Sequence, residues 1–144
     1  MRAPSAGEIR LWAGAALGRR ARGRELAVRV VGPRESRLLN ARYRGRDEPT
    51  NVLSFPAGEH LARLAPDPAV KAPLGDLVLC SPVVAREARH QGKSLRAHWA
   101  HLIVHGALHL VGYDHVEPRD ARRMERREIA VLKGLGFANP YRSD

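Results

Sequence analysis

The sequence predicts one α/β domain, residues 1–144, in which a small mixed sheet packs against about five helices. Its length suits a single hydrophobic core, because domains usually hold roughly 100–200 residues. Its composition, 44% hydrophobic and 28% charged, is that of an ordinary globular protein and excludes a disordered or fibrous chain. Segments with helical apolar spacing alternate with short β-branched runs, which indicates that helices and strands alternate along the chain.

The N-terminal part predicts a helix, a strand and a second helix. Ser5 and Glu8 form a capping box, which begins a helix expected to run to about Arg20. Apolar residues alternate over 26–30 and indicate a strand. A glycine-proline pair breaks this strand, and a short second helix is expected from Leu38 onward.

The remainder of the chain predicts two more strands and three more helices. The strands are expected at 50–55 and 74–80, and the helices at 81–91, 94–110 and 117–135. Residues 57–73 contain three prolines and no clear period. We expect this segment to be a surface loop rather than a mobile lid.

The charge of the chain favours a polyanionic partner. Twenty-five basic and 15 acidic residues give a net charge of +10, and 10 arginines stand against two glutamates between Arg19 and Arg46. Arginine suits phosphate because its planar guanidinium forms paired hydrogen bonds. A solvated surface that keeps the protein soluble would explain the same charge.

Neither a disulfide nor a membrane segment is expected. Cys80 is the single cysteine, which suits a reducing compartment and excludes a metal site built from several cysteines. The apolar stretch at 11–17 is too short to span a bilayer. We therefore expect a soluble, cytoplasmic protein without a membrane partner.

Three histidines predict a metal site at the end of a central helix. His105 and His109 are four residues apart, so both rings lie on one helix face, one turn apart. Gly112 can adopt a positive φ and end the helix, which would return His115 toward the same ion. Three imidazoles leave one open position on a tetrahedral ion, the arrangement of catalytic zinc. We expect one Zn²⁺ per chain, although imidazole also suits nickel, copper and iron.

Each of three nearby side chains allows two interpretations. His98 and His101 lie near the same helix face and could contact a ligand or substrate, but ordinary packing is the simpler expectation. Asp114 could orient the imidazole of His115 or stabilise the turn.

The histidine spacing also matches the metzincin peptidase pattern H-E-x-x-H-x-x-G-x-x-H. Gly106 stands where those peptidases have the glutamate that removes a proton from zinc-bound water. Met124 is too close to the histidines, inside a predicted helix, to form the methionine turn of that family. A metallopeptidase is therefore the less favoured interpretation. A metal-activated water beside an arginine-rich flank suits a phosphodiester better.

Two segments resemble the YbeY family of bacterial endoribonucleases, also called rRNA maturation factors. Residues 101–115, HLIVHGALHLVGYDH, resemble one family motif, and residues 40–56, NARYRGRDEPTNVLSFP, resemble the other. Gly75-Asp76-Leu77 and Met124-Glu125-x-x-Glu128 resemble weaker family motifs. The resemblance extends from about residue 25 to Tyr141.

This resemblance implies a zinc held by His105, His109 and His115, with Arg44 facing it across a cleft. It also implies cleavage of single-stranded RNA during maturation of the 3′ end of small-subunit (16S) rRNA, and a role in ribosome quality control. Implied partners are ribosomal RNA, the small ribosomal subunit, the GTPase Era and a small-subunit ribosomal protein. Position alone would make Arg44 a solvated charge at a helix end.

The sequence therefore predicts a zinc-dependent endoribonuclease in which Arg44 neutralises charge that develops on phosphate. Weaker candidates for the pocket are Asn40, Arg46, Ser54 and Asp76. A non-catalytic ribosome-assembly factor with a structural zinc is the alternative from a different functional class.

Overall fold

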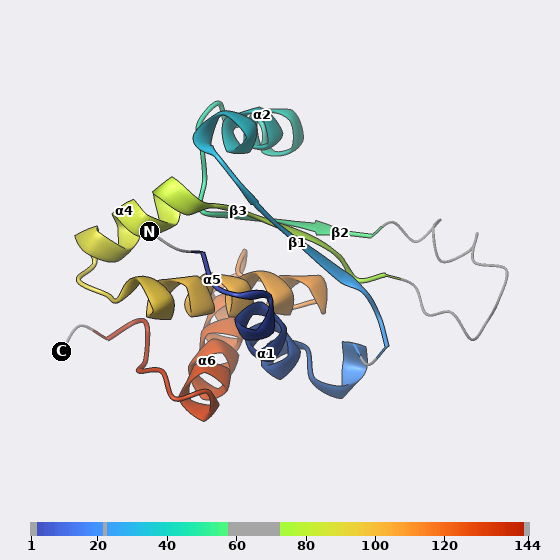
Figure 1. Cartoon of the computed structure of the whole chain (residues 1–144). Coiled ribbons are helices and arrows are strands. Elements are labelled where there is room, and N and C mark those ends of the chain that lie inside the picture. The colour runs from blue at the N-terminus through green and yellow to red at the C-terminus, as the bar shows by residue number, and fades with distance from the viewer. Residues whose placement is uncertain (1–2, 22, 58–72, 143–144) are drawn as a thin grey trace, which may run out of the picture.

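The computed structural model describes residues 3–21, 23–57 and 73–142 (Figure 1). The loop expected at 57–73 therefore lies, except for its two end residues, outside the described residues. The elements in chain order are α1 (Ala6–Leu17), the short 3₁₀ helix η1 (Gly18–Ala21), β1 (Leu26–Val31), α2 (Pro33–Arg44), β2 (Val52–Pro56), β3 (Gly75–Cys80), α4 (Ser81–His90), α5 (Leu95–Leu110) and α6 (Pro118–Gly134).

The three strands form one mixed sheet in the order β1-β3-β2. The central strand β3 runs parallel to β1, with Leu26 opposite Gly75, and antiparallel to β2, with Val52 opposite Leu79. The described residues form five α-helices around this sheet. The predicted fold class is thus confirmed.

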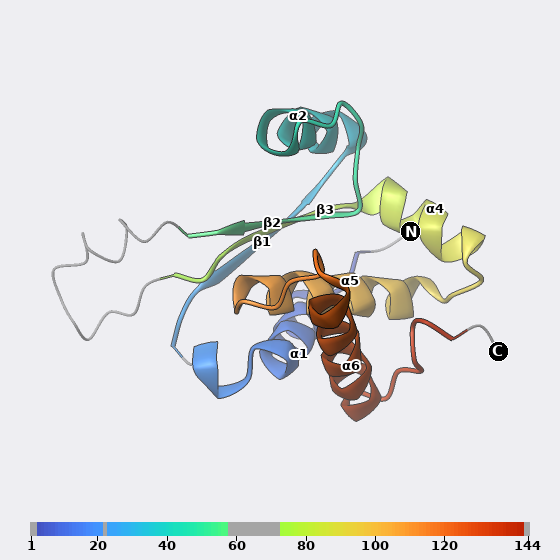
Figure 2. The ribbon, with the colours of Figure 1, turned by 180° about the vertical axis from the view of Figure 1, so that it is seen from behind.

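Helices cover both faces of the sheet, as Figure 2 shows for α2 on one face and α5 on the other. Successive side chains of a strand point to opposite faces. Leu77 and Leu79 of β3 accordingly pack in the large core formed with α1, α5 and α6. Val78 points the other way and packs with Leu53 against Leu39 of α2.

Three element boundaries differ from the sequence expectation by more than one residue. The α-helical geometry of α1 ends at Leu17, and the chain continues as a 3₁₀ turn instead of an α-helix to Arg20. The second helix begins at Pro33 rather than near Leu38, because proline is preorganised for the first turn of a helix. The second strand begins at Val52 rather than Thr50.

Thr50 stays outside the strand because it is bound to α2. Its N–H donates to Ser36 Oγ at 2.9 Å, and the Ser36 hydroxyl donates to the Thr50 carbonyl at 3.1 Å. These two hydrogen bonds occupy the backbone groups that a strand residue would use for pairing.

The central helix α5 crosses the sheet closely at Gly106. A Cβ atom at this position would lie 2.8 Å from Leu77 Cδ2 and 3.2 Å from Ser54 Oγ. Glycine therefore allows the helix to approach β2 and β3, which places the C-terminal turns of α5 beside β2.

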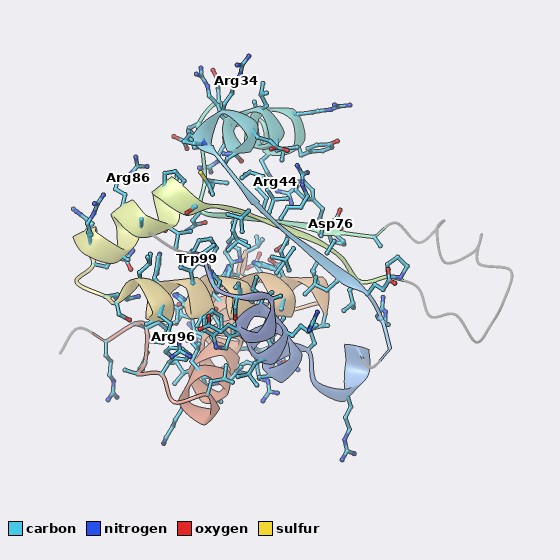
Figure 3. All side chains as sticks on the ribbon, in the orientation of Figure 1. Arg34, Arg44, Asp76, Arg86, Arg96 and Trp99 are labelled. Carbon is cyan, nitrogen blue, oxygen red and sulfur yellow. The ribbon has the colours of Figure 1, made fainter. Side chains whose placement is uncertain are left out.

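The two ends of α2 are oriented differently with respect to the sheet. Arg34, near the start of the helix, points away from the sheet, whereas Arg44, at its end, points toward it (Figure 3).

No helix in the described part of the chain combines the length and the apolar composition that a membrane span requires.

Candidate active site

The last turns of α5 and the following loop bring three imidazole rings together. The ring centroids are 4.8 Å apart for His105 and His109, 4.7 Å for His109 and His115, and 5.6 Å for His105 and His115. One ring nitrogen from each side chain lies within 4.8 Å of the others. The three histidines expected from the sequence thus form one cluster that could hold a metal ion.

A Schellman motif at the end of α5 returns the chain toward this cluster. Gly112 has a φ of 103°, which strains any residue with a side chain. The Tyr113 N–H donates to the Leu108 carbonyl at 3.1 Å, and the Gly112 N–H donates to the His109 carbonyl at 3.1 Å. Asp114 Oδ1 accepts from the His115 backbone N–H at 2.7 Å, so Asp114 stabilises the turn.

The chemistry of the three side chains fits zinc. Burial lowers the pKa of His109, and the neighbouring His105 and His115 lower it further. The His109 imidazole is therefore neutral at neutral pH, which is the form that coordinates a metal. Three imidazole nitrogens that line one pocket are a donor set typical of catalytic zinc.

Glu128 of α6 lies behind this cluster and is 1% exposed. Its Oε1 lies 3.0 Å from His105 Nδ1, and its Oε2 lies 2.7 Å from His101 Nε2. The Tyr141 hydroxyl donates to the same Oε2 at 2.8 Å. The buried carboxylate therefore has three hydrogen-bonding partners from α5 and the C-terminal segment.

The ionisation of Glu128 and Tyr141 follows from these contacts. Burial alone would raise the pKa of Glu128, but hydrogen bonds with His101 and His105 outweigh it and lower the pKa to about 2. Burial and the adjacent carboxylate raise the pKa of Tyr141 well above its usual value. Glu128 is thus an anion, and Tyr141 keeps its proton as a hydrogen-bond donor.

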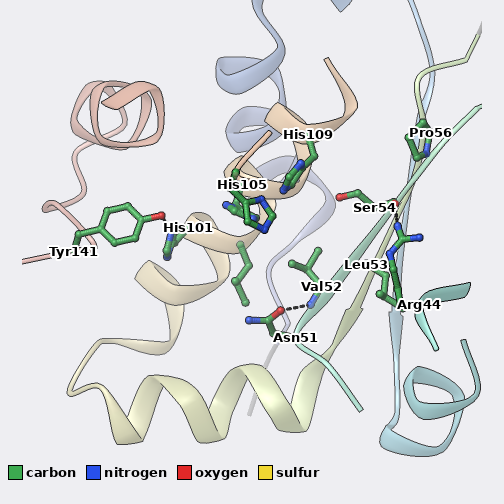
Figure 4. Close-up of a pocket in the computed structure, with 12 residues that line it drawn as sticks. Arg44, Asn51, Val52, Leu53, Ser54, Pro56, His101, His105, His109 and Tyr141 are labelled. Atoms are coloured by element: carbon green, nitrogen blue, oxygen red, sulfur yellow. Dashed lines mark hydrogen bonds between the residues drawn. The ribbon is translucent and has the colours of Figure 1, made fainter. Parts of the chain in front are cut away.

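The histidines open into a pocket of about 520 Å³. Figure 4 shows His101, His105 and His109 on one side of this pocket and Ser54 and Arg44 on the other. His115 and Tyr141 also line it. Among the described residues, no carboxylate lines the pocket, so Arg44 and the histidines are its basic groups, and the apolar Val52, Leu53, Pro56 and Leu102 form the rest of its wall with Asn51 and Ser54.

Arg44 is held in place at the β2 side of the pocket. Its Nη2 donates to the Ser54 carbonyl at 2.8 Å, and its guanidinium lies 5.5 Å from the centre of the Phe55 ring. A guanidinium has five N–H donors, so Arg44 can bind further acceptors while it keeps these contacts.

Of the four weaker pocket candidates, the fold brings Ser54 alone to the pocket. Ser54 lines the pocket, and its hydroxyl donates to the Gly106 carbonyl at 3.2 Å. Asn40, Arg46 and Asp76 are not among the lining residues. Asn40 is buried and its Nδ2 donates to the Glu48 carbonyl at 2.8 Å, which is a structural contact. Asp76 is exposed, and strand alternation places it on the α2 face of β3.

His98 and His101 lie in different surroundings. His98 is buried, with its Nε2 2.9 Å from Glu87 Oε1, and is not part of the pocket lining. The packing role expected for His98 agrees with this position. His101 was expected to have a similar role, but it lines the pocket and contacts Glu128.

Sequence reasoning missed Glu128, Tyr141 and Asn51 as site residues. Glu128 carried a usable signal, because it shares the apolar face of α6 with Met124, Val131 and Leu132. A carboxylate in such a stripe requires buried partners. Tyr141 and the pocket residue Asn51 carried no comparable signal, because packing between distant segments places them.

The chain matches one protein family over most of its length. The family model described as Endoribonuclease YbeY matches residues 10–136. Two proteins named Endoribonuclease YbeY are similar over 139 residues, which is 96% of this chain. The protein from Halorhodospira halophila is 54% identical, with 88% of its length covered. The protein from Methylococcus capsulatus is 52% identical, with 87% covered.

A solved structure supports the fold independently. The solution structure of a protein from Thermotoga maritima matches with a TM-score of 0.52 at 23% identity. The match covers 96% of this chain and 85% of that one. Since the family model and both relatives match nearly the whole chain, this chain belongs to the family described as Endoribonuclease YbeY.

Proposed function

We propose that this protein is a zinc-dependent endoribonuclease that cleaves single-stranded RNA. The observation that carries the proposal is that three converging imidazoles and a fixed arginine line one open pocket. The names of the two relatives, Endoribonuclease YbeY, support RNA as the substrate class. The net charge of +10 supports a polyanionic substrate.

The residues of the pocket have different roles in the proposed reaction. His105, His109 and His115 would hold the zinc through one nitrogen each. Zinc bound there supplies Lewis acidity and lowers the pKa of water toward about 7. Arg44 binds a non-bridging phosphate oxygen and stabilises the negative charge that develops during phosphodiester cleavage. The hydrogen bond to the Ser54 carbonyl fixes the direction of the guanidinium, so little reorganisation is needed.

We further propose maturation of the 3′ end of small-subunit rRNA and ribosome quality control as the cellular role. The partners in this proposal are ribosomal RNA, the small ribosomal subunit, the GTPase Era and a small-subunit ribosomal protein, in the cytoplasm. The family membership and the basic charge support this role.

The pocket is less suited to a peptidase. At Gly106, where a metzincin has its catalytic glutamate, even a Cβ atom would lie 2.8 Å from Leu77. The described lining contains no other carboxylate that could act as the general base.

The direct test is incubation of purified zinc-loaded protein with an RNA that contains the 3′ precursor of small-subunit rRNA. We expect endonucleolytic cleavage in the single-stranded precursor, which sequencing of the RNA ends will locate. Chelator and His109→Ala should abolish the new ends. Binding without cleavage would instead favour the non-catalytic assembly factor.

A further inference from the structure

We propose that Glu128 is a positioning residue that holds the imidazole of His105 with Nε2 directed at the metal. The inference rests on the proposed metal site, and it concerns how the protein prepares that site before an ion binds. Tyr141 and His101 take part by holding the carboxylate in one orientation.

The contact between Glu128 and His105 selects one ring nitrogen for the ion. Glu128 Oε1 lies 3.0 Å from His105 Nδ1, so Nδ1 carries the proton and donates. A neutral imidazole has only one N–H, which leaves the lone pair on Nε2. That nitrogen can then serve in the cluster that His105 forms with His109 and His115. A carboxylate behind a ligating histidine fixes both its tautomer and its orientation.

The other oxygen of Glu128 anchors the carboxylate. Oε2 lies 2.7 Å from His101 Nε2 and accepts from the Tyr141 hydroxyl at 2.8 Å. The side chain is 1% exposed, so water does not compete for these contacts. The carboxylate cannot rotate without breaking hydrogen bonds to two segments far apart in sequence.

The same atoms allow one competing interpretation. Nitrogens of His101 and His105 and an oxygen of Glu128 lie within 4.8 Å of one another and could themselves hold an ion. The Tyr141 hydroxyl, a hydrogen-bond donor to the same Oε2, favours a hydrogen-bonded carboxylate instead. The number of ions bound per chain distinguishes a positioning role of Glu128 from a second metal site, since a second site requires two ions per chain.

The test compares Glu128→Gln with Glu125→Gln, an identical change at an exposed position on the same helix. Glutamine offers one acceptor oxygen, and its amide nitrogen only donates, so it cannot satisfy three donors. We expect zinc affinity, measured by competition with a chelator, to fall about 10–100-fold in Glu128→Gln. It should be unchanged in Glu125→Gln. Tyr141→Phe removes one of the three hydrogen bonds and should give a smaller loss.

Nitrogen-15 NMR of the histidine rings provides a readout that a general loss of packing would not produce. In the metal-free parent protein, the neutral imidazole of His105 should carry its proton at Nδ1 and not at Nε2. In Glu128→Gln we expect a mixture of both tautomers.

Three results would overturn the proposal: unchanged zinc affinity in folded Glu128→Gln, a parent His105 protonated at Nε2, or two ions per chain. The spectrum of the parent protein tests the proposed His105 tautomer even if Glu128→Gln does not fold. Because neither affinity nor tautomer requires RNA cleavage, failure of the proposed nuclease activity would be recognised separately.

Discussion

His109 occupies the centre of the histidine cluster, with both other rings within 4.8 Å of its own. His109→Ala leaves two imidazoles, which are too few to retain zinc against competing cellular ligands. Metal content measured by elemental analysis should therefore fall well below one ion per chain. His90→Ala, at an exposed position on α4, is the control and should keep full occupancy. Stoichiometric metal in His109→Ala would show that the three-histidine site is wrong.

Arg44 should affect the rate of cleavage far more than the stability of the fold. Its removal deletes a charge aimed at the pocket, so Arg44→Ala should raise the barrier to RNA cleavage by about 2–4 kcal/mol. Zinc occupancy and thermal stability should stay near those of the parent. Single-turnover rates at saturating RNA are the measurement.

Arg34→Ala is the matched control for Arg44, because both arginines belong to α2 and Arg34 points away from the sheet (Figure 3). Arg34→Ala should weaken RNA binding but leave the cleavage rate at saturating RNA close to that of the parent protein. Equal cleavage rates for Arg44→Ala and the parent protein would remove Arg44 from the catalytic group. They would also favour the non-enzymatic assembly factor.

At the scale of elements, the close crossing of α5 over the sheet depends on Gly106. Gly106→Ala places a methyl group 2.8 Å from Leu77 Cδ2, and Leu77 is fully buried. Overpacking of this kind costs about 1–3 kcal/mol. Gly106→Glu should destabilise the protein further and should not create peptidase activity.

Chemical denaturation of metal-free protein measures this effect, with Gly14→Ala as the control. Gly14 lies within α1, and nothing stands within 4 Å of a Cβ atom placed there. Alanine should therefore stabilise α1 by about 0.5–1 kcal/mol. Because alanine brings the same helix gain at Gly106, a Gly106→Ala protein stabilised as much as Gly14→Ala would show that the helix crossing has space for a methyl group.

The junction between α4 and α5 should make stability depend on pH. Burial lowers the pKa of His98, although its contact with Glu87 opposes this effect. Below the ordinary histidine pKa of about 6.5, the unfolded chain therefore binds a proton that the native chain does not. The free energy of unfolding therefore decreases as the pH falls below about 6.5, because the unfolded state binds more protons than the native state.

Denaturant titrations of metal-free protein across this pH range test the contribution of His98. His98→Gln removes the titrating group, so its free energy of unfolding should change less with pH than that of the parent protein. His109 titrates in both proteins and cancels in the comparison. Identical slopes would assign the pH dependence to other groups.

At the scale of the whole molecule, the net charge of +10 predicts RNA binding that depends strongly on salt. Each phosphate neutralised on a single strand releases condensed counterions and contributes about −0.7 to the slope of log affinity against log salt. Fluorescence anisotropy with a catalytically inactive variant measures this slope. A flat dependence would identify the arginine excess as a solvated surface without a role in RNA binding.

The local features of this protein were determined by the sequence itself. The Ser5–Glu8 capping box and the turn at Gly112 both form as expected. Each depends on residues within a few positions of one another. The histidine cluster was predictable for the same reason, since helical spacing and one turn bring its rings together.

Contacts between distant segments were decided only by the tertiary structure. Glu128 is 23 residues from His105 in sequence, and Tyr141 is 40 residues from His101. Neither spacing has a period from which a contact could be inferred. The packing of α6 against α5 makes the first contact, and the path of the C-terminal segment makes the second. Arg44 lines the pocket because the end of α2 lies close enough to β2 for its guanidinium to donate to the Ser54 carbonyl. The family resemblance implied this position, but no local pattern encodes it.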